Sequence, residues 1–230
     1  MACGVIAAIS LGVAAQAARL AHAESVRGPS KAEVDAAARA GVAQRWEQLT
    51  LGQIFPASVG YTSAQQTRET AVRLGIGAGD SCDEAIDRTL DRAAQHWGCV
   101  AAIRASYADN LDGTVYTVGV VVFPDHGAAS EFATHVPSGG DPATGLRPLT
   151  LPRTATALFV DKSRQLSALR VTGPYVVLAV AGYADGRAAG QAAEPRPSVF
   201  GPATSSIVSA VVAPLAAPEP VRCGNPEWTC

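Results

Sequence analysis

The chain has 230 residues, of which 48% are hydrophobic and 17% are charged, so it is apolar enough to fold and disorder throughout is excluded. Once the first fifty residues are set aside, its length suits one globular domain. Eighteen basic and twenty acidic residues are mixed along the sequence, and Lys31 and Lys162 are the two lysines. Because no basic stripe could follow a phosphate backbone, we expect no nucleic-acid partner.

The opening segment, Ala2 to Ala18, carries no charged side chain. A spanning helix needs about twenty apolar residues, whereas the apolar part of a signal peptide is shorter. The small-x-small pattern Ala21-His22-Ala23 predicts cleavage before Glu24. No basic residue precedes Arg19, which leaves open an uncleaved signal anchor or a start upstream of Met1. A buried Ala-rich helix of the domain is the alternative; otherwise the rest of the chain lies outside the cytoplasm.

Four cysteines beyond Cys3 support an oxidising compartment, because an even number permits complete pairing. They are Cys82, Cys99, Cys223 and Cys230, whose spacing does not match a zinc ribbon or finger. We therefore expect all four in disulfides, with three pairings open. Cys223 and Cys230 enclose a short loop in which glycine and proline can turn, so this pair is plausible on local grounds.

A disulfide between Cys82 and Cys99 requires a bend in the chain. One straight helix over residues 83–97 would hold its ends roughly 20 Å apart, whereas a disulfide needs Cα atoms within about 7 Å. The most natural break is at Asp87, which could cap a second helix that begins at Arg88. Alternatively, Cys82 or Cys99 pairs with a C-terminal cysteine.

The first half of the domain reads as helical. Ser30 and Glu33 form a capping-box pattern ahead of apolar residues at helical spacing up to Leu49. After a linker that contains Pro56 and Gly60, we predict a second helix from Ser63 to Leu74 and further helical structure from Ser81 to Trp97.

The second half reads mainly as strands. Residues 100–109 alternate between apolar and polar, and residues 113–123 are apolar on both faces, which is typical of a central strand. Three more strands are predicted at 154–160, 165–172 and 175–183. The strands are interrupted by a short helix over residues 128–136 and a Pro- and Gly-rich loop over residues 137–153, and they are followed by a closing helix over residues 203–212.

Short strands joined by tight turns pair antiparallel, so the order of elements predicts an α+β fold. We expect an antiparallel sheet of about five strands with helices on one face, preceded by an N-terminal apolar helix. The predicted domain organisation is a signal peptide or anchor over 1–23, a membrane-proximal helix and linker over 24–60, the α+β domain over 61–215 and a Cys-containing tail over 216–230.

Three sequence stretches carry a resemblance to a known class of domain. They are VVVFPD at residues 120–125, AASEF at 128–132 and GPYVVLAVAGYADGR at 173–187. Within residues 80–213 this pattern resembles the membrane-anchored extracytoplasmic sensor or solute-binding-like domains of actinobacterial proteins, including the extracellular parts of some Ser/Thr kinases. The resemblance implies a disulfide-stapled α+β fold coupled to a membrane helix, and it assigns no ligand-binding residue.

Motifs for catalysis and metal binding do not converge in this sequence. The glycine-rich run at residues 75–79 follows a predicted helix, so it reads as a helix stop instead of a phosphate loop. Asp83, Asp87 and Asp91 share a helical face that we interpret as solvated. No HExxH, GxSxG or SxxK motif occurs, and the histidines are dispersed. We therefore expect no metal and no cofactor.

A repeated Tyr-Ala-Asp tripeptide provides the one candidate ligand site. It occurs at Tyr107 to Asp109 and again at Tyr183 to Asp185, each time where a predicted strand runs into a turn. If the strand ends lie close together, Tyr107, Asp109, Tyr183, Asp185 and Arg187 could rim a pocket. Chance repetition in an alanine-rich chain is the alternative.

The expected function is that of a non-catalytic extracytoplasmic binding or sensor-like domain, secreted or held to the membrane by an uncleaved N-terminal segment. Its partner would be a protein or small molecule outside the cytoplasm. The long loop over residues 137–153 favours binding, since an irregular connection of this length is commonly functional or disordered. Two alternatives are a cell-envelope hydrolase with dispersed catalytic residues and a structural envelope component.

Overall fold

The computed structural model describes residues 30–77, 81–137, 141–190 and 196–217, together with Gln16, Ala17, Arg19, His22 and Gly28. The chain divides into two compact units, Gly41–Pro218 and a second made of Met1–Ala40 with Glu219–Cys230. Apart from these isolated positions, the predicted N-terminal apolar helix and the cleavage pattern lie outside the described residues, as do Cys223 and Cys230.

The described elements alternate between helices and antiparallel hairpins. The helices are α2 (Lys31–Gln48), α3 (Leu51–Ile54), α4 (Cys82–Ala85), α5 (Arg88–His96), α6 (His126–Ala133), the 3₁₀ turn η1 (Asp161–Ser163) and α7 (Arg196–Ala216). The strands are β1 (Ser58–Thr62), β2 (Arg68–Ile76), β3 (Ala101–Asp109), β4 (Thr114–Val122), β5 (Arg164–Thr172) and β6 (Tyr175–Tyr183).

The start of α2 follows the predicted capping box. The Ser30 N–H donates to Glu33 Oε2 at 2.7 Å, and the Glu33 N–H donates to Ser30 Oγ at 3.3 Å. Each side chain thereby satisfies a backbone donor that the first helical turn leaves unpaired. The predicted helix from Ser30 to Leu49 is confirmed.

The six strands form one antiparallel sheet in the order β1-β2-β3-β4-β6-β5. The central position predicted for residues 113–123 is confirmed, because β4 pairs with β3 on one side and with β6 on the other. The antiparallel α+β class is confirmed as well. The predicted number of about five strands is one too few.

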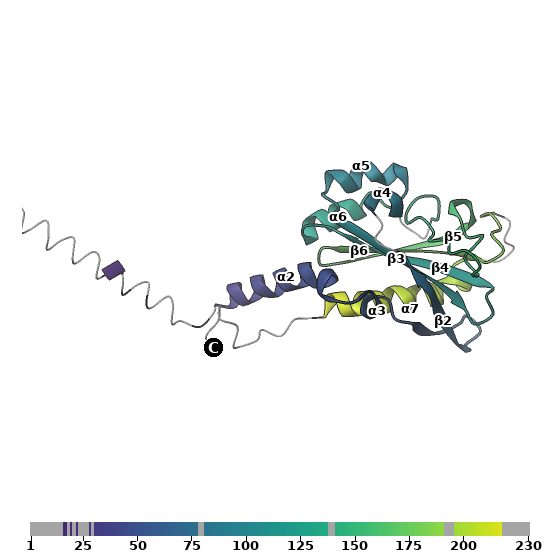
Figure 1. The fold of residues 1–230 in the computed structure, drawn as a ribbon, viewed down its shortest axis with the longest axis horizontal. Helices are drawn as coiled ribbons and strands as arrows, with labels where there is room; N and C mark the ends of the chain where they lie inside the picture. Colours follow the sequence, from purple (N-terminus) through teal and green to yellow (C-terminus); the bar gives the residue numbers. More distant parts are fainter. Residues whose placement is uncertain are drawn as a thin grey trace, which may run out of the picture. The chain divides into compact units, whose positions relative to one another are not determined.

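Helices cover both faces of this sheet, so the prediction of helices on one face is wrong. Figure 1 shows α4, α5 and α6 on one side of the strands and α3 and α7 on the other. In β4, Val118 and Val120 pack in the core cluster that contains α7, whereas Val115 and Val121 pack in the cluster that contains α5 and α6. A strand that is apolar on both faces needs cover on both faces.

The closing helix α7 is longer than the predicted range of 203–212. It is the one described helix that is long and apolar enough to cross a membrane. Its side chains Phe200, Ile207, Val211 and Leu215 are nevertheless buried in the core cluster against the sheet. Packing on the sheet therefore accounts for these apolar side chains.

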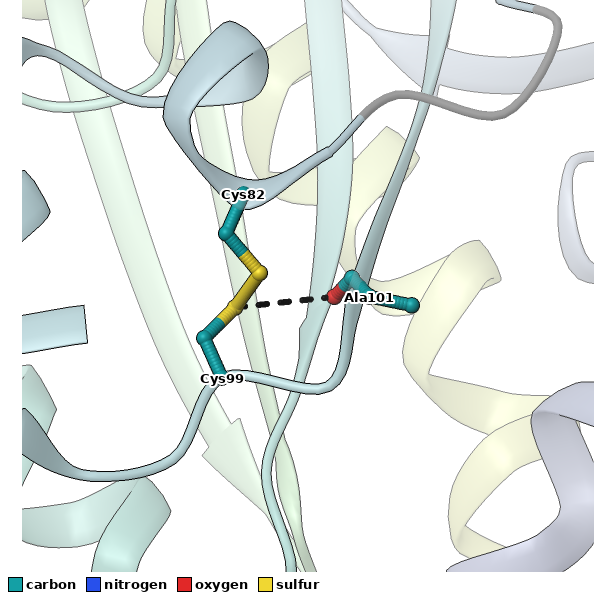
Figure 2. The surroundings of a disulfide bond; sticks show 3 residues. All are labelled: Cys82, Cys99 and Ala101. Carbon is teal, nitrogen blue, oxygen red and sulfur yellow. Dashed lines mark hydrogen bonds between the residues drawn. A yellow bond between two sulfur atoms is a disulfide. The ribbon is translucent and has the colours of Figure 1, made fainter. Parts of the chain in front are cut away.

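The opposite face is fastened by a disulfide between Cys82, at the start of α4, and Cys99, just before β3 (Figure 2). Their Cα atoms lie 6.4 Å apart. The predicted break is confirmed: α5 begins at Arg88 with Asp87 in an extended conformation at its N-cap. The sulfur of Cys99 lies 3.8 Å from the carbonyl oxygen of Ala101, the first residue of β3, and a dashed line marks this contact in Figure 2.

The helix predicted from Ser63 to Leu74 is wrong, because this stretch belongs to the hairpin of β1 and β2. Between the strands the Ser63 N–H donates to Thr67 O at 2.9 Å, and Gln66 closes the turn with φ 62°. The glycine-rich run after this stretch likewise begins inside β2 instead of ending a helix. Pairing with β3 through Ala71 and Val72 decides the strand conformation.

The strand predicted over residues 154–160 is also wrong. Ala157 N–H donates to Thr154 O and Phe159 N–H donates to Thr156 O, both at 3.0 Å, which makes consecutive turns. Phe159 is fully buried, so the apolar signal marked a core contact and not a strand.

Candidate functional site

The predicted Tyr-Ala-Asp site is only partly assembled. Tyr107 is fully buried, and its hydroxyl donates to Pro56 O at 2.9 Å. This burial raises the pKa of the Tyr107 hydroxyl. Tyr107 therefore belongs to the core and does not rim a pocket.

Asp109 caps the turn between β3 and β4. Its carboxylate accepts from the Gly113 N–H at 2.8 Å and from Thr114 Oγ1 at 2.9 Å. Thr114 of β4 is the register partner of Tyr183 of β6, so one strand, β4, lies between Asp109 and the second tripeptide. The two repeats end on β3 and β6, which β4 separates.

Tyr183, Asp185 and Arg187 do come together at the end of β6. The Arg187 Nε donates to Asp185 Oδ2 at 2.8 Å, and its guanidinium lies 4.1 Å from the centre of the Tyr183 ring. The hydrogen bond from Arg187 holds the pKa of the Asp185 carboxyl below its usual value. The Tyr183 ring in turn meets Phe200 of α7 edge to face, with ring centroids 5.0 Å apart. This cluster orders the chain after β6 at the surface.

Just after this turn, at Ala189, the chain reaches a hollow in the surface, which we call the loop hollow. It is lined by residues 141–143 of the long loop, by Asp161, Lys162 and Arg164 around η1, and by Ala189, and its volume is about 430 Å³. Gln165 Nε2 donates to Arg187 O at 3.0 Å, and Ala189 N–H donates to Lys162 O at 3.3 Å. These bonds join the predicted Arg187 turn to the hollow.

Arg164 fixes the floor of the loop hollow. Its side chain is 5% exposed and its Nη1 lies 2.7 Å from Asp87 Oδ2, the carboxylate before α5, which is 15% exposed. The same guanidinium donates to Ala143 O and Leu146 O, both at 3.1 Å. Because one cation holds the long loop, the strand and the N-terminus of α5, the hollow has a preformed base.

The long loop is a fixed layer over β3 and β4. Ser106 Oγ donates to Leu149 O at 2.7 Å, and the Leu149 N–H donates to Thr117 Oγ1 at 3.1 Å. Leu146 is buried above Gly119, where a Cβ would overlap its side chain. β3 and β4 thus hold the long loop in place, and Asp141 of this loop lines the hollow.

The rim of the loop hollow offers charges of both signs. Asp141, Asp161 and Lys162 are exposed, and Asp161 lies 3.6 Å from Arg147 Nε. Within the described ranges, no group of three or more His, Cys, Asp or Glu side chains could hold a metal ion. Hydrogen bonding and ion pairing with a polar molecule are the chemistry that these residues provide.

One contact resembles part of a hydrolase site. Ser130 Oγ lies 3.4 Å from His126 Nε2, and His126 Nδ1 lies 3.1 Å from Gly173 O. His126 is exposed and Ser130 is half-buried, one turn apart on α6, and they line neither the loop hollow nor the groove between β5 and α7. The contact therefore lies apart from both of these surface hollows.

The sequence reading missed Arg164 and misread Asp87, which it placed on a solvated helical face. Two signals were available: a long loop of unusual composition, and an arginine at the start of a strand that is otherwise largely uncharged. Neither signal shows that Asp87 is the ion-pair partner of Arg164. Comparisons with protein families, curated proteins and solved structures found no match to this chain.

Proposed function

We propose that this protein is a non-catalytic extracytoplasmic binding module that takes a small polar ligand in the loop hollow. The observation that carries the proposal is the hollow itself, about 430 Å³ in volume and built on a buried, multiply bonded Arg164. This volume falls within the range of small-molecule sites, and a preformed floor lowers the entropic cost of binding. A ligand with both acidic and basic groups suits Lys162 and the two exposed aspartates.

The extracytoplasmic location is part of the proposal. The uncharged opening segment and the Ala21-His22-Ala23 pattern favour export, either cleaved or as a membrane anchor. The disulfide between Cys82 and Cys99 suits an oxidising compartment. The pattern resemblance to actinobacterial sensor and solute-binding-like domains agrees with a binding role outside the cytoplasm.

The test uses the full chain in a thermal-shift screen against amino acids, short peptides and cell-envelope fragments. A ligand at 100 times its Kd stabilises the native state by about 2.7 kcal/mol, which raises the melting temperature by several degrees. We expect Lys162→Ala to abolish this shift. Lys31→Ala, at the only other lysine in the chain, is the matched control and should retain it.

Lysine acetylation locates the ligand independently. A bound ligand should protect Lys162 and leave Lys31 fully reactive. No stabilising compound, or a shift that survives Lys162→Ala, would refute binding in the loop hollow. Turnover of a generic ester or peptide substrate that Ser130→Ala abolishes would favour the hydrolase alternative instead.

A further inference from the structure

The outer edge of the sheet at β5 has an open half. β5 is the last strand in the sheet order, and in the part of the chain that the structure describes it pairs with β6 alone. Near its start the long loop lies against it, since Ser167 Oγ donates to Asp141 O at 2.6 Å. Towards its end, Leu169 remains 39% exposed and Arg170 is exposed.

The register shows which backbone groups point away from the sheet. Thr172 pairs with Tyr175 across the turn, and Arg170 pairs with Val177. Hydrogen-bonded and non-hydrogen-bonded pairs alternate along an antiparallel ladder, and the pair next to a two-residue turn is hydrogen-bonded. Leu169 and Val171 therefore direct their N–H and C=O groups outward, where a further strand would pair.

A groove runs beside this edge, between β5 and α7. Its volume is about 270 Å³, and it is lined by Leu166, Ala168 and Arg170 of β5 and by small residues of α7 that include Gly201, Ser205 and Ser209. Leu166 and Ala168 pack in the same core cluster as α7, whereas Val171 packs in the cluster on the other face. Alternate side chains of an added strand would thus enter the groove.

Arg170 determines which kind of strand fits. Its Nη1 lies 3.5 Å from Ser209 Oγ, and no carboxylate within the described ranges forms an ion pair with it. A guanidinium that has no ion-pair partner among the described residues, beside open backbone donors and acceptors, complements a peptide that carries a carboxylate.

The same residue disfavours a second copy of this chain. Two β5 edges that paired antiparallel through Leu169 and Val171 of both copies would place Arg170 directly opposite Arg170. Like charges in opposite positions of an antiparallel pair are destabilising. Such an edge charge is a common way for proteins to prevent self-pairing.

We propose that the β5 edge binds an extended acidic peptide segment of a partner protein as an added strand. The partner's main chain pairs with Leu169 and Val171, small or β-branched side chains enter the β5–α7 groove, and an Asp or Glu lies against Arg170. This strand addition is a second site, separate from the loop hollow.

The first experiment selects displayed random short peptides on the immobilised full chain. We expect sequences that alternate β-branched or small residues and carry Asp or Glu at one fixed position. Arg170→Glu should select Lys or Arg at that position and weaken the original peptides at least ~10-fold. Arg170→Lys keeps the charge and should keep the acidic preference, and Lys162→Ala should change neither.

The second experiment tests main-chain pairing with peptides N-methylated at alternate residues. Methylation of the residues whose N–H faces β5 should abolish binding, whereas methylation of the intervening residues should not. Val171→Pro removes an outward donor without touching the pairing with β6, so it should also abolish binding.

Three results would overturn the proposal: no enriched sequence, enrichment that Arg170→Glu leaves unchanged, or equal binding of both methylated series. A concentration-dependent dimer in sedimentation that Val171→Pro disrupts would show that a second copy occupies the edge instead. Loss of the thermal shift with Lys162→Ala bears only on the loop hollow, so the two sites succeed or fail separately.

Discussion

Gly182 on β6 has no room for a side chain. A Cβ at this position would overlap the carbonyl oxygen of Ser163 and the ring of the fully buried Phe159. Because a backbone carbonyl cannot rotate aside as a side chain can, we expect Gly182→Ala to lower the free energy of unfolding by about 1–3 kcal/mol in urea denaturation.

Gly60 on β1 is the matched control for this prediction. A Cβ there would find its nearest contact at 4.0 Å, from Glu69 O, so Gly60→Ala should change stability little. Equal losses for the two variants would show that alanine in a strand, and not overlap at Gly182, is responsible.

The pair of Arg164 and Asp87 should contribute strongly to stability. Arg164→Met leaves the Asp87 carboxylate and two loop carbonyls without their cation, at a cost of about 3–5 kcal/mol in urea denaturation. Adding Asp87→Asn to this variant should recover part of the loss, because no buried charge then remains unpaired.

The exposed pair of Arg187 and Asp185, with side chains 46% and 52% exposed, provides the comparison. Arg187→Met should leave the denaturation midpoint nearly unchanged, since solvent screens such pairs. If Arg164→Met behaves like Arg187→Met, Arg164 does not hold the floor of the loop hollow.

The disulfide links the start of α4 to Cys99, just before β3, and so closes the segment that holds the short helices α4 and α5. α4 and α5 pack on the sheet through few large side chains, and the bond closes a loop with a sequence separation of 17. Cross-linking a loop of this length stabilises a fold by about 3 kcal/mol in the chain-entropy model. We expect Cys82→Ser with Cys99→Ser to lower the melting temperature and to accelerate amide exchange in α4 and α5 first.

Thiol labelling of the unfolded, unreduced protein checks the same bond. Cys82 and Cys99 should be unreactive in protein isolated from its native compartment, and the earlier expectation extends this to Cys223 and Cys230. Labelling of Cys82 and Cys99 would contradict both the disulfide and the oxidising location.

Elements with a strong local signal were predictable. A strand apolar on both faces gave the central position of β4, and the geometric demand of a disulfide located the break at Asp87. The same two-faced pattern in β4 already implied helices on both sides of the sheet, and this implication was missed. The hairpin of β1 and β2 was missed because its turn places Gln66 in a left-handed conformation. Glycine or asparagine usually marks such a position, and neither is present there.

The candidate site was less predictable than the fold. Tyr183, Asp185 and Arg187 are close in sequence, and the structure joins them. Arg164 and Asp87 are 77 positions apart, so no local pattern links them. The long loop was recognised from its length and composition, whereas its attachment over β3 and β4 depends on the tertiary pairing of Ser106 and Thr117 with Leu149.

The tyrosines make the stability of the whole domain sensitive to alkaline pH. Burial raises the hydroxyl pKa of four of the five tyrosines, namely Tyr61, Tyr107, Tyr116 and Tyr175. For Tyr116 the pKa rises to about 12. The Tyr61 hydroxyl donates to Glu69 Oε2 at 2.6 Å, and ionisation would break this bond. The Tyr116 hydroxyl lies 2.9 Å from Thr114 Oγ1, and it is burial that opposes its ionisation.

The direction of the effect follows from proton binding. Unfolded tyrosine ionises near pH 10, whereas the folded protein retains these protons to higher pH. Their contribution is therefore complete below about pH 10 and is lost as the pH rises through the folded values. For Tyr116 alone the free energy of unfolding should fall by about 1.4 kcal/mol per pH unit between pH 10 and 12.

Urea denaturation at a series of alkaline pH values measures this slope, and tyrosinate absorbance shows when the protons leave. We expect absorbance to rise together with unfolding, because the core releases these protons only when it opens. Tyr116→Phe keeps the ring, removes one titrating group and should make the slope shallower. Gly60→Ala changes no titrating group, so it should keep the parent slope. Gradual ionisation of Tyr61, Tyr107, Tyr116 and Tyr175 in a still-folded protein would contradict the prediction, because it would mean that their hydroxyls are accessible to solvent.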